Sequence, residues 1–173
     1  MRHIVVVLIA LNLASCASVI RTDLMKQGTR NPSLAVLVQS PDMYRGQLFI
    51  LGGVIARTTL KAEGSEIEAL YVPVDNWGYP QEAGPSSQRF LAVSRPEQGI
   101  LDPLIYHKNR GTTIAGVFTG IVSGRVDEMG YVFPRFRIMQ IYLEPKRPAA
   151  VYYYYYPPSY MGPGWWGYPW GRW

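Results

Sequence analysis

Few side chains in this sequence have the chemistry of a nucleophile, a proton carrier or a metal ligand. The chain has one cysteine, Cys16, and two histidines, His3 and His107. Nucleophilic catalysis needs a Ser–His or Cys–His pair, and no G-x-S-x-G motif occurs. A single histidine without close carboxylates does not make a metal site. We therefore expect no catalytic residue, metal or cofactor, and we interpret His107 as a helix-surface or capping residue.

The acidic residues that could act in pairs have local explanations. Asp75, Asp102, Asp127 and Glu128 each lie in a predicted turn or cap. A glycosidase with two carboxylates depends on proximity in space, so it stays open as an alternative. No glycine-rich phosphate loop is present, and we interpret Gly111, Gly116, Gly120 and Gly124 as bends in a curled strand.

The chain begins with the pattern of a bacterial export signal. Arg2 precedes an apolar run, 4–13, and small residues then lead to Cys16. The run is about half of the ~20 residues that a spanning helix needs. Leu13-Ala14-Ser15-Cys16 resembles a lipobox, the signature at which the cysteine thiol is acylated and the chain is cleaved. We expect residues 1–15 to be a lipoprotein signal peptide and Cys16 to be the lipidation site.

Acylation of Cys16 has consequences for location and stability. Two or more acyl chains anchor a protein stably, whereas one binds only marginally. Because acylation consumes the only cysteine, no disulfide can form. Ala17, rather than Asp, follows the cysteine, which by resemblance to enteric lipoproteins favours the outer membrane. We expect a lipid-anchored, periplasm-facing protein.

Residues 16–33 are predicted to be the lipidated cysteine and a tether. They show no sustained periodicity and end in the turn-forming Asn31-Pro32-Ser33. As a flexible coil, the tether would hold its ends on the order of 20–25 Å apart. The chain has 17 Lys and Arg against 12 Asp and Glu, without basic runs. This excess suits an acidic lipid or glycan surface and predicts no nucleic-acid partner.

Short apolar runs separated by Gly, Pro and Asn predict a β domain over residues 34–145. Gly52-Gly53 permits a bulge or bend inside its second run. Asp102, Pro103 and Gly111 suit the cap, first turn and end of one short helix, 101–111. The expected strands are 34–39, 48–58, 66–75, 89–94, 112–124 and 131–143.

From Gln47 onward, three strands, a helix and two strands follow one another. This is the element order of an OB-type barrel, whose closure also removes exposed sheet edges. We predict a mainly β fold: a small, OB-like, curled barrel of five to six strands with one short helix and flexible flanking tails. A β-sandwich is the alternative.

Three stretches carry a resemblance to a known family. They are YRGQLFILGGVI (44–55), GILDPLIYHKNRGTTIAGVFTG (99–120) and QIYLEP (140–145). Together with the lipobox, they resemble the Slp family of outer-membrane lipoproteins, whose members are named for starvation-inducible expression. The resemblance extends to about Pro145. It implies an envelope lipoprotein and brings no catalytic residues with it.

Residues 146–173 form an aromatic, Pro- and Gly-rich, low-complexity tail. Tyr or Trp occupies eleven of its 28 positions. The tail could be only weakly ordered. It could also lie on membrane lipid, stack on peptidoglycan or another envelope glycan, or bind an envelope protein with help from Arg147 and Arg172. The expected contact residues are Tyr152, Tyr153, Tyr154, Trp165, Trp166, Trp170 and Trp173.

These observations favour an outer-membrane lipoprotein with a non-catalytic binding or structural role, related to stress or starvation. One alternative is a periplasmic carrier of a lipid or small ligand, which predicts an apolar cavity. Another is an envelope enzyme that acts on glycan, which needs convergent acids near the barrel mouth and loop 76–88.

Overall fold

The computed structural model describes residues 18–81 and 86–145. The predicted signal peptide, the predicted lipidation site Cys16 and the aromatic tail 146–173 lie outside the described residues.

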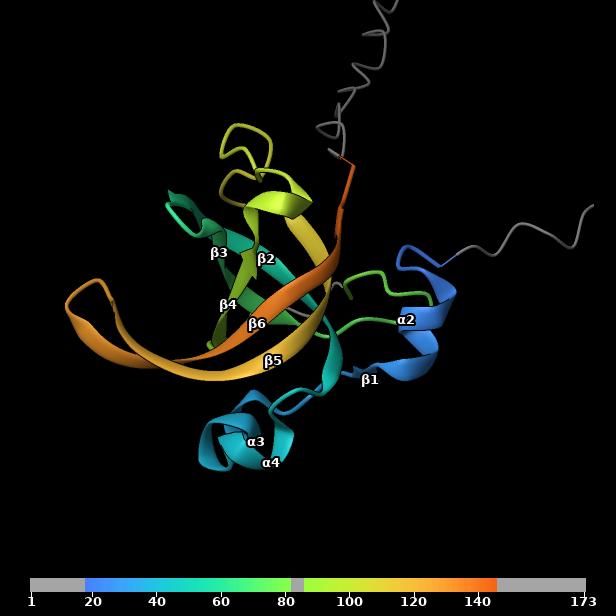
Figure 1. The fold of residues 1–173 in the computed structure, drawn as a ribbon, viewed down its shortest axis with the longest axis horizontal. Helices are drawn as coiled ribbons and strands as arrows, with labels where there is room; N and C mark the ends of the chain where they lie inside the picture. Colours follow the sequence, from blue (N-terminus) through green and yellow to red (C-terminus); the bar gives the residue numbers. More distant parts are fainter. Residues whose placement is uncertain (1–17, 82–85, 146–173) are drawn as a thin grey trace, which may run out of the picture.

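Five long strands close into a barrel (Figure 1). They are β2 (Leu48–Lys61), β3 (Gly64–Val72), β4 (Arg89–Ser94), β5 (Gly111–Val126) and β6 (Met129–Leu143). The sheet order is β2-β3-β4-β6-β5, and β5 pairs back onto β2. All pairings among these five strands are antiparallel except β4 with β6. This order is that of an OB-type barrel, so the predicted fold class is confirmed.

Irregularities in pairing give the long strands their curvature. The β5–β6 pairing shifts register between Ala115 and Gly116 and again between Phe118 and Gly120, where Gly120 has a φ of 128°. These two glycines are bends, as the sequence predicts. Gly52-Gly53 is different, because β2 pairs regularly through it on both sides. A side chain at Gly53 would meet β3 and the ring of Phe90, so close packing explains the glycine.

The barrel interior is filled by aromatic and aliphatic side chains. Phe136 lies at its centre, with its ring centroid 5.8 Å from that of Phe90 and 5.5 Å from that of Phe118. Ile55, Ile67 and Ile114 are fully buried in the same cluster. Such dense aromatic packing stabilises the closed barrel.

The segment before the barrel is packed, which corrects the expected tether. Helix α2 (Thr22–Gln27) leads into β1 (Thr29–Arg30), which pairs in parallel with β2. Ile20 and Leu24 are buried in a second cluster with Ile50, Val74 and Ala115 on the outer side of the barrel. A flexible coil was predicted because the apolar residues here are too sparse to show a period, yet they cover one patch of the sheet.

Residues 34–39, predicted as a strand, form helix α3 (Leu34–Gln39), followed by α4 (Pro41–Tyr44). Leu34 and Leu37 are buried in the main cluster, and their spacing suits one helical face. Tertiary contact with one end of the barrel therefore outweighs the strand preference of the valines. This is a correction to the sequence-based prediction.

The helix predicted over 101–111 is also wrong. Asp102 accepts backbone hydrogen bonds from Ile105 and Tyr106, which makes one turn. Asn109 then adopts a φ of 69° and donates its backbone N–H to Ile55, so the chain joins the edge of β2. The one helix assigned between β4 and β5, a segment that lies wholly within the described residues, is the short 3₁₀ helix η2 (Pro96–Gln98).

Candidate binding surface

The site residues predicted from sequence are not tested by the structure. Cys16 and the seven tail aromatics, Tyr152, Tyr153, Tyr154, Trp165, Trp166, Trp170 and Trp173, lie outside the described residues. They remain predictions.

The polar residues considered for chemistry have local roles. The Nδ1 atom of His107 lies 2.8 Å from the backbone oxygen of Lys108. Asp75 accepts hydrogen bonds from the backbone N–H groups of Trp77 and Tyr79 and so closes their loop. Asp102 does the same for Leu104. Over residues 18–81 and 86–145, no group of three or more His, Cys, Asp or Glu side chains could hold a metal ion.

The structure instead brings basic side chains together on the outer surface of the barrel. On β4, Phe90 and Ala92 point into the core, so Arg89 and the alternate residues after it point outward. On β6, the buried Phe136 likewise leaves Arg135 and Arg137 on the outer side. We call this surface the arginine face. Its cations are Arg57, Arg89, Arg95, Arg125, Arg135, Arg137 and Lys108.

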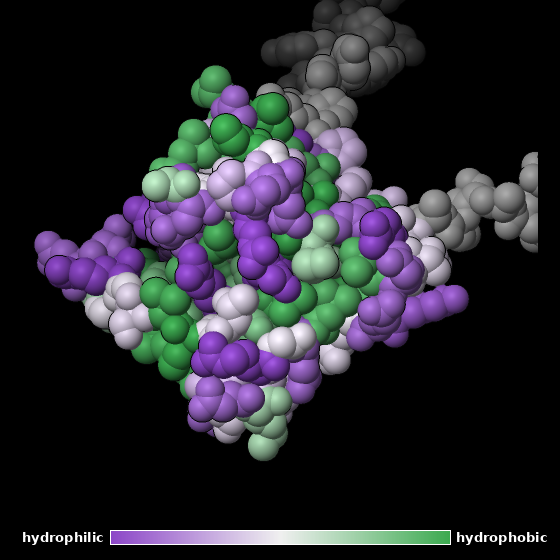
Figure 2. Space-filling model, in the orientation of Figure 1, coloured by the Kyte–Doolittle hydropathy of each residue, from purple (hydrophilic) through white to green (hydrophobic). Residues whose placement is uncertain are grey.

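Strand register explains why these cations converge. Arg57 of β2 lies opposite Glu68 of β3, which lies opposite Leu91 of β4. Leu91 in turn lies beside Arg135 of β6. The row therefore crosses four strands, from the β2–β3 hairpin to β4 and β6, and brings Arg57 and Arg135 onto one surface. Figure 2 shows strongly hydrophilic side chains over the centre of the view, where β4 and β6 lie in Figure 1, with hydrophobic ones around them.

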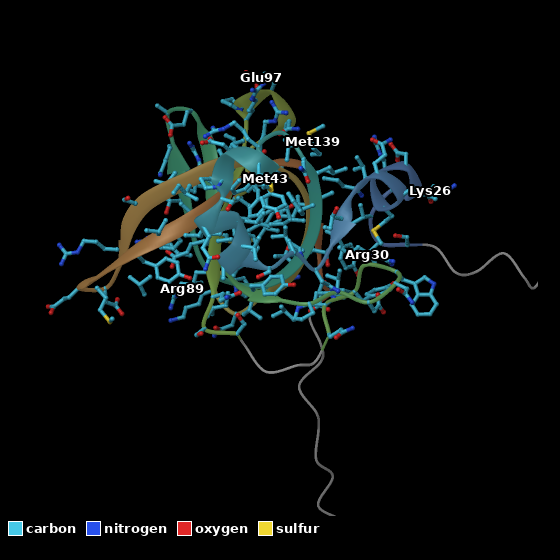
Figure 3. The ribbon with its side chains drawn as sticks, turned by 90° about the horizontal axis from the view of Figure 1, so that it is seen from below. Lys26, Arg30, Met43, Arg89, Glu97 and Met139 are labelled. Atoms are coloured by element: carbon cyan, nitrogen blue, oxygen red, sulfur yellow. The ribbon has the colours of Figure 1, made fainter. Side chains whose placement is uncertain are left out.

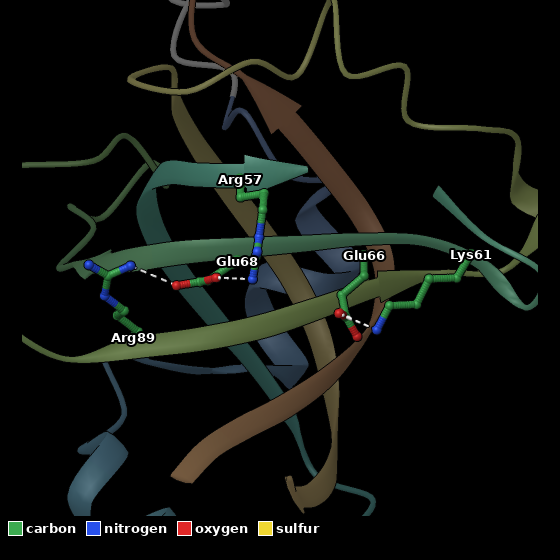
Figure 4. Close-up of polar contacts among 5 residues, drawn as sticks. All are labelled: Arg57, Lys61, Glu66, Glu68 and Arg89. Atoms are coloured by element: carbon green, nitrogen blue, oxygen red, sulfur yellow. Dashed lines mark hydrogen bonds and ion pairs between the residues drawn. The ribbon is translucent and has the colours of Figure 1, made fainter. Parts of the chain in front are cut away.

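Glu68 organises one part of the arginine face (Figure 4). One carboxylate oxygen lies 2.6 Å from Arg89 and the other 3.0 Å from Arg57. The Glu68 side chain is only 7% exposed, whereas that of Arg57 is 68% exposed. Lys61 and Glu66 form a neighbouring pair at 2.5 Å. One carboxylate thus fixes two guanidinium groups and leaves most of the Arg57 side chain open to solvent.

A depression of about 480 Å³ lies at this position. Arg125 and Asp127 reach it from the β5–β6 hairpin, and Lys108 from the loop before β5. Its charged lining residues are Arg57, Arg89, Lys108 and Arg125 against Glu68 and Asp127. Positive charge is therefore in excess, and the depression suits an anionic group.

A second depression of about 380 Å³ lies farther along β4 and β6. Arg95, Arg135 and Arg137 line it, and Glu63 is their acidic neighbour, 3.9 Å from Arg135. The Nε atom of Arg137 is buried and has no hydrogen-bond partner within the part of the chain that the structure describes. A buried donor without a partner is costly, and an anion that binds the exposed parts of these guanidinium groups would offset part of that cost.

Sequence reasoning missed the arginine face because it looked for runs of basic residues. The available signal was alternation: Arg135 and Arg137 flank Phe136, and Arg89 precedes the apolar pair Phe90-Leu91. On a half-buried strand, such alternation predicts basic side chains on the outer face. What it does not predict is which strands stand side by side.

Aromatic residues gather elsewhere on the molecule. The rings of Tyr79 and Tyr142 meet edge to face, with centroids 6.0 Å apart. Burial raises the pKa of the Tyr142 hydroxyl, and the neighbouring charges of Tyr79 and Glu144 raise it further. Burial also raises the pKa of Tyr71, on β3. Trp77 is 48% exposed and lies in the loop after β3.

Comparison with known proteins identifies the family. Residues 13–172 match the family described as "Outer membrane lipoprotein Slp family". This chain belongs to the Slp family of outer membrane lipoproteins. The resemblance found in the sequence is confirmed, and the match includes Cys16. Family membership implies lipid anchoring.

A relative and a solved structure are also similar to this Slp-family chain. The "Uncharacterized lipoprotein YeaY" of Escherichia coli (strain K12) is 28% identical over 134 residues, which are 76% of this chain and 65% of that protein. The mitochondrial single-stranded DNA binding protein Rim1 of S. cerevisiae covers 56% of this chain and 93% of its own, with 10% identity and a TM-score of 0.33. A similarity at that TM-score supports no inference about this chain's ligand.

None of the helices in the described ranges has both the length and the apolar character needed to cross a membrane.

Proposed function

We propose that this Slp-family lipoprotein is a periplasm-facing, non-catalytic binding protein of the outer membrane. Acylated Cys16 anchors it, and the arginine face binds an anionic group of the cell envelope. The ligand chemistry is phosphate or carboxylate, as carried by lipid head groups and by acidic glycans.

The observation that carries this proposal is the second depression. Three arginines converge there, and the buried Nε of Arg137 has no partner among the described residues. Arginine suits this role because its planar fork matches the geometry of phosphate and carboxylate oxygens. A bound oxyanion would pair with the guanidinium groups that line the depression and neutralise their mutual repulsion.

The filled core of the barrel favours a ligand site on the outer surface over one in the interior. Phe90, Phe118 and Phe136 occupy the barrel interior, where a carrier would hold an apolar ligand. The open depressions are lined mainly by charged side chains instead. We therefore favour recognition of a charged group over transport of an apolar one.

The aromatic tail is proposed as an additional contact with envelope lipid or glycan. Pro145, the last described residue before it, follows Glu144, whose backbone N–H donates to Gly111. The tail therefore starts at a fixed point beside the beginning of β5. Its aromatic side chains suit stacking on sugar rings or insertion at a membrane interface.

Anion binding by the full lipidated chain in nonionic detergent tests the proposal. Tripolyphosphate and an oligogalacturonate would serve as probes for phosphate and carboxylate, followed by calorimetry. The double variant Arg135→Ala with Arg137→Ala should weaken binding at least about tenfold, since hydrogen bonds to charged groups contribute about 1.5–3 kcal/mol each. The control, Lys61→Ala, removes an exposed cation of β2 that lines none of the three depressions and should leave affinity unchanged.

The two probes also separate the sources of the ligand. Preference for tripolyphosphate would indicate phosphorylated lipid or sugar, and preference for the oligogalacturonate would indicate a carboxylated glycan. Equal affinity of the wild type and the double variant, with both folded by circular dichroism, would refute the proposal.

A further inference from the structure

We infer that one end of the domain is seated directly on an anionic phospholipid surface. This end, which we call the anchor end, consists of Ser18-Val19, α2 and the loop 75–81. The inference rests on the acylation of Cys16 and is independent of anion binding by the arginine face.

The chain between the acylated cysteine and the folded domain is short. Ser18 is the first described residue, and Val19 already donates its backbone N–H to Trp77. Only Ala17 separates Ser18 from Cys16, so the two Cα atoms are at most about 7.6 Å apart. An acylated Cys16 lies at the lipid interface. The short link therefore holds the start of the anchor end beside the membrane surface, and the tilt of the domain against the lipid depends on the contacts that this end makes.

The loop at the anchor end presents Trp77 in a fixed position. Ser18 Oγ and Val19 N both donate to the backbone oxygen of Trp77, at 3.1 and 3.0 Å. Asp75 closes the loop from within, and Thr113 Oγ1 donates to the oxygen of Gly78 at 2.6 Å. Trp77 nevertheless stays 48% exposed. An exposed Trp side chain on a backbone held in this way, beside a lipid anchor, suits the interface, where Trp and Tyr concentrate.

Charge at the anchor end complements an anionic membrane. A depression of about 570 Å³ is lined by Ser18, Arg21, Thr22, Lys26, Arg30 and Asn76, among others. Asp23 pairs with Arg21 at 2.9 Å, which leaves Lys26 and Arg30 as the excess cations. Each Lys or Arg near an anionic surface contributes about 1 kcal/mol, or about fivefold in an equilibrium constant. The depression has the composition to accept a phospholipid head group.

The seated orientation leaves the proposed ligand surface accessible. Figure 3 shows Lys26 and Arg30 at the end of the molecule that carries α2, while Arg89 lies well away from them across the barrel. In Figure 1, α2 and the β5–β6 hairpin lie at opposite sides of the fold. With α2 on the membrane, the hairpin points away from it.

Two added cysteines, one on each side of the fold, test the orientation. Acylation consumes Cys16, so Thr22→Cys at the anchor end and Met129→Cys in the β5–β6 hairpin each carry a unique thiol for an environment-sensitive nitrobenzoxadiazole dye. Both positions are exposed. The full lipidated chains would be reconstituted into phosphatidylethanolamine–phosphatidylglycerol vesicles, after mass spectrometry has established acylation.

If the anchor end lies on the membrane, lipid-borne nitroxides should quench the dye at position 22 and not the dye at position 129. Adding Trp77→Ala, or Lys26→Glu with Arg30→Glu, should lower the quenching at position 22. The charge reversal should act on anionic vesicles and not on purely zwitterionic ones, by about fivefold or more in the seated-to-free ratio. Adding Met129→Ala to the Thr22→Cys chain is the matched control and should change nothing.

Equal quenching at both positions, or stronger quenching at position 129, would overturn the inference. The inference would also be overturned if the dye at position 22 were shielded from water in detergent and this shielding disappeared when residues 146–173 were deleted. The tail would then cover the anchor end. Shielding of the dye that depends on protein concentration would mean that a second copy of the chain covers the anchor end. Absence of acylation in the mass spectrum would remove the premise without affecting the anion-binding test.

Discussion

Replacing Glu68 by Gln should weaken folding and strengthen anion binding at the same time. Its carboxylate is 7% exposed and lies 2.6 Å from Arg89 and 3.0 Å from Arg57. Glutamine keeps the shape and some hydrogen-bonding capacity but removes the negative charge. The two arginines would then repel each other across the first depression, with Asp127 the remaining carboxylate in its lining.

The magnitude follows from the exposure of each partner. The bond to Arg89, whose side chain is 26% exposed, is a charge-assisted contact that contributes about 1.5–3 kcal/mol. The pair with Arg57 is largely exposed and contributes less than about 1 kcal/mol. We expect Glu68→Gln to lower the free energy of unfolding by about 2–3 kcal/mol in total. Removing one charge about 4 Å from a bound anion in a water-like dielectric is worth about 1 kcal/mol, or about fivefold tighter binding.

Urea unfolding followed by circular dichroism measures the first effect, and calorimetric titration with tripolyphosphate measures the second. Glu66→Gln is the matched control on the same face, because its partner Lys61 is 41% exposed and Glu66 does not line either depression. That control should lose less than about 1 kcal/mol. Weaker anion binding by Glu68→Gln, or unfolding unchanged from the wild type, would refute the reasoning.

Three further predictions test the packed N-terminal segment, a buried tyrosine and the lipid anchor. Ile20→Ala should lower the free energy of unfolding in urea by about 2–5 kcal/mol because Ile20 is fully buried. The control Met43→Ala, at an exposed position, should change it little. Equal losses of unfolding free energy in the two variants would support a flexible tether instead. Because burial raises the pKa of Tyr71 above its ordinary value of 10.0, the hydroxyl's contribution to stability is present below pH 10 and is lost as the pH rises through the folded-state pKa. The unfolding free energy of the wild type should therefore fall relative to Tyr71→Phe above pH 10, and parallel pH profiles would contradict this. Cys16→Ser should accumulate as an uncleaved, unacylated precursor by mass spectrometry, and normal processing of this variant would exclude Cys16 as the anchor.

The strands of the barrel were predictable because their pattern is local. Residues 89–94 coincide with β4 as predicted, and the two longest predicted runs lie within β5 and β6. Alternation, turn residues and strand length are all visible within a dozen neighbours. The order of strands and one interruption then sufficed for the OB-type fold class.

The two wrong elements lie where distant contacts decide the conformation. Residues 34–39 have the apolar residues of a strand, but the barrel end accepts Leu34 and Leu37 from a helix. Residues 101–111 have the caps of a helix, but Leu101 is held by Ser65 Oγ and Asn109 by Ile55. In each segment, contacts from across the fold outweigh a local preference that amounts to less than about 1 kcal/mol per residue.

The sequence by itself determined what is encoded in neighbouring residues: the resemblance of Leu13-Ala14-Ser15-Cys16 to a lipobox, the family, the strands and the composition of the tail. Tertiary structure alone decided which strands and segments lie side by side, because this depends on closure of the barrel. The parallel pairing of β4 with β6 sets Arg135 beside Leu91. The packing of Ile20 and Leu24 holds the N-terminal segment against the barrel, where Val19 donates its backbone N–H to Trp77. A local pattern fixes which way a side chain points from its strand. Which strand lies next to it depends on contacts between residues that are dozens of positions apart, and those form only when the whole chain closes around its core.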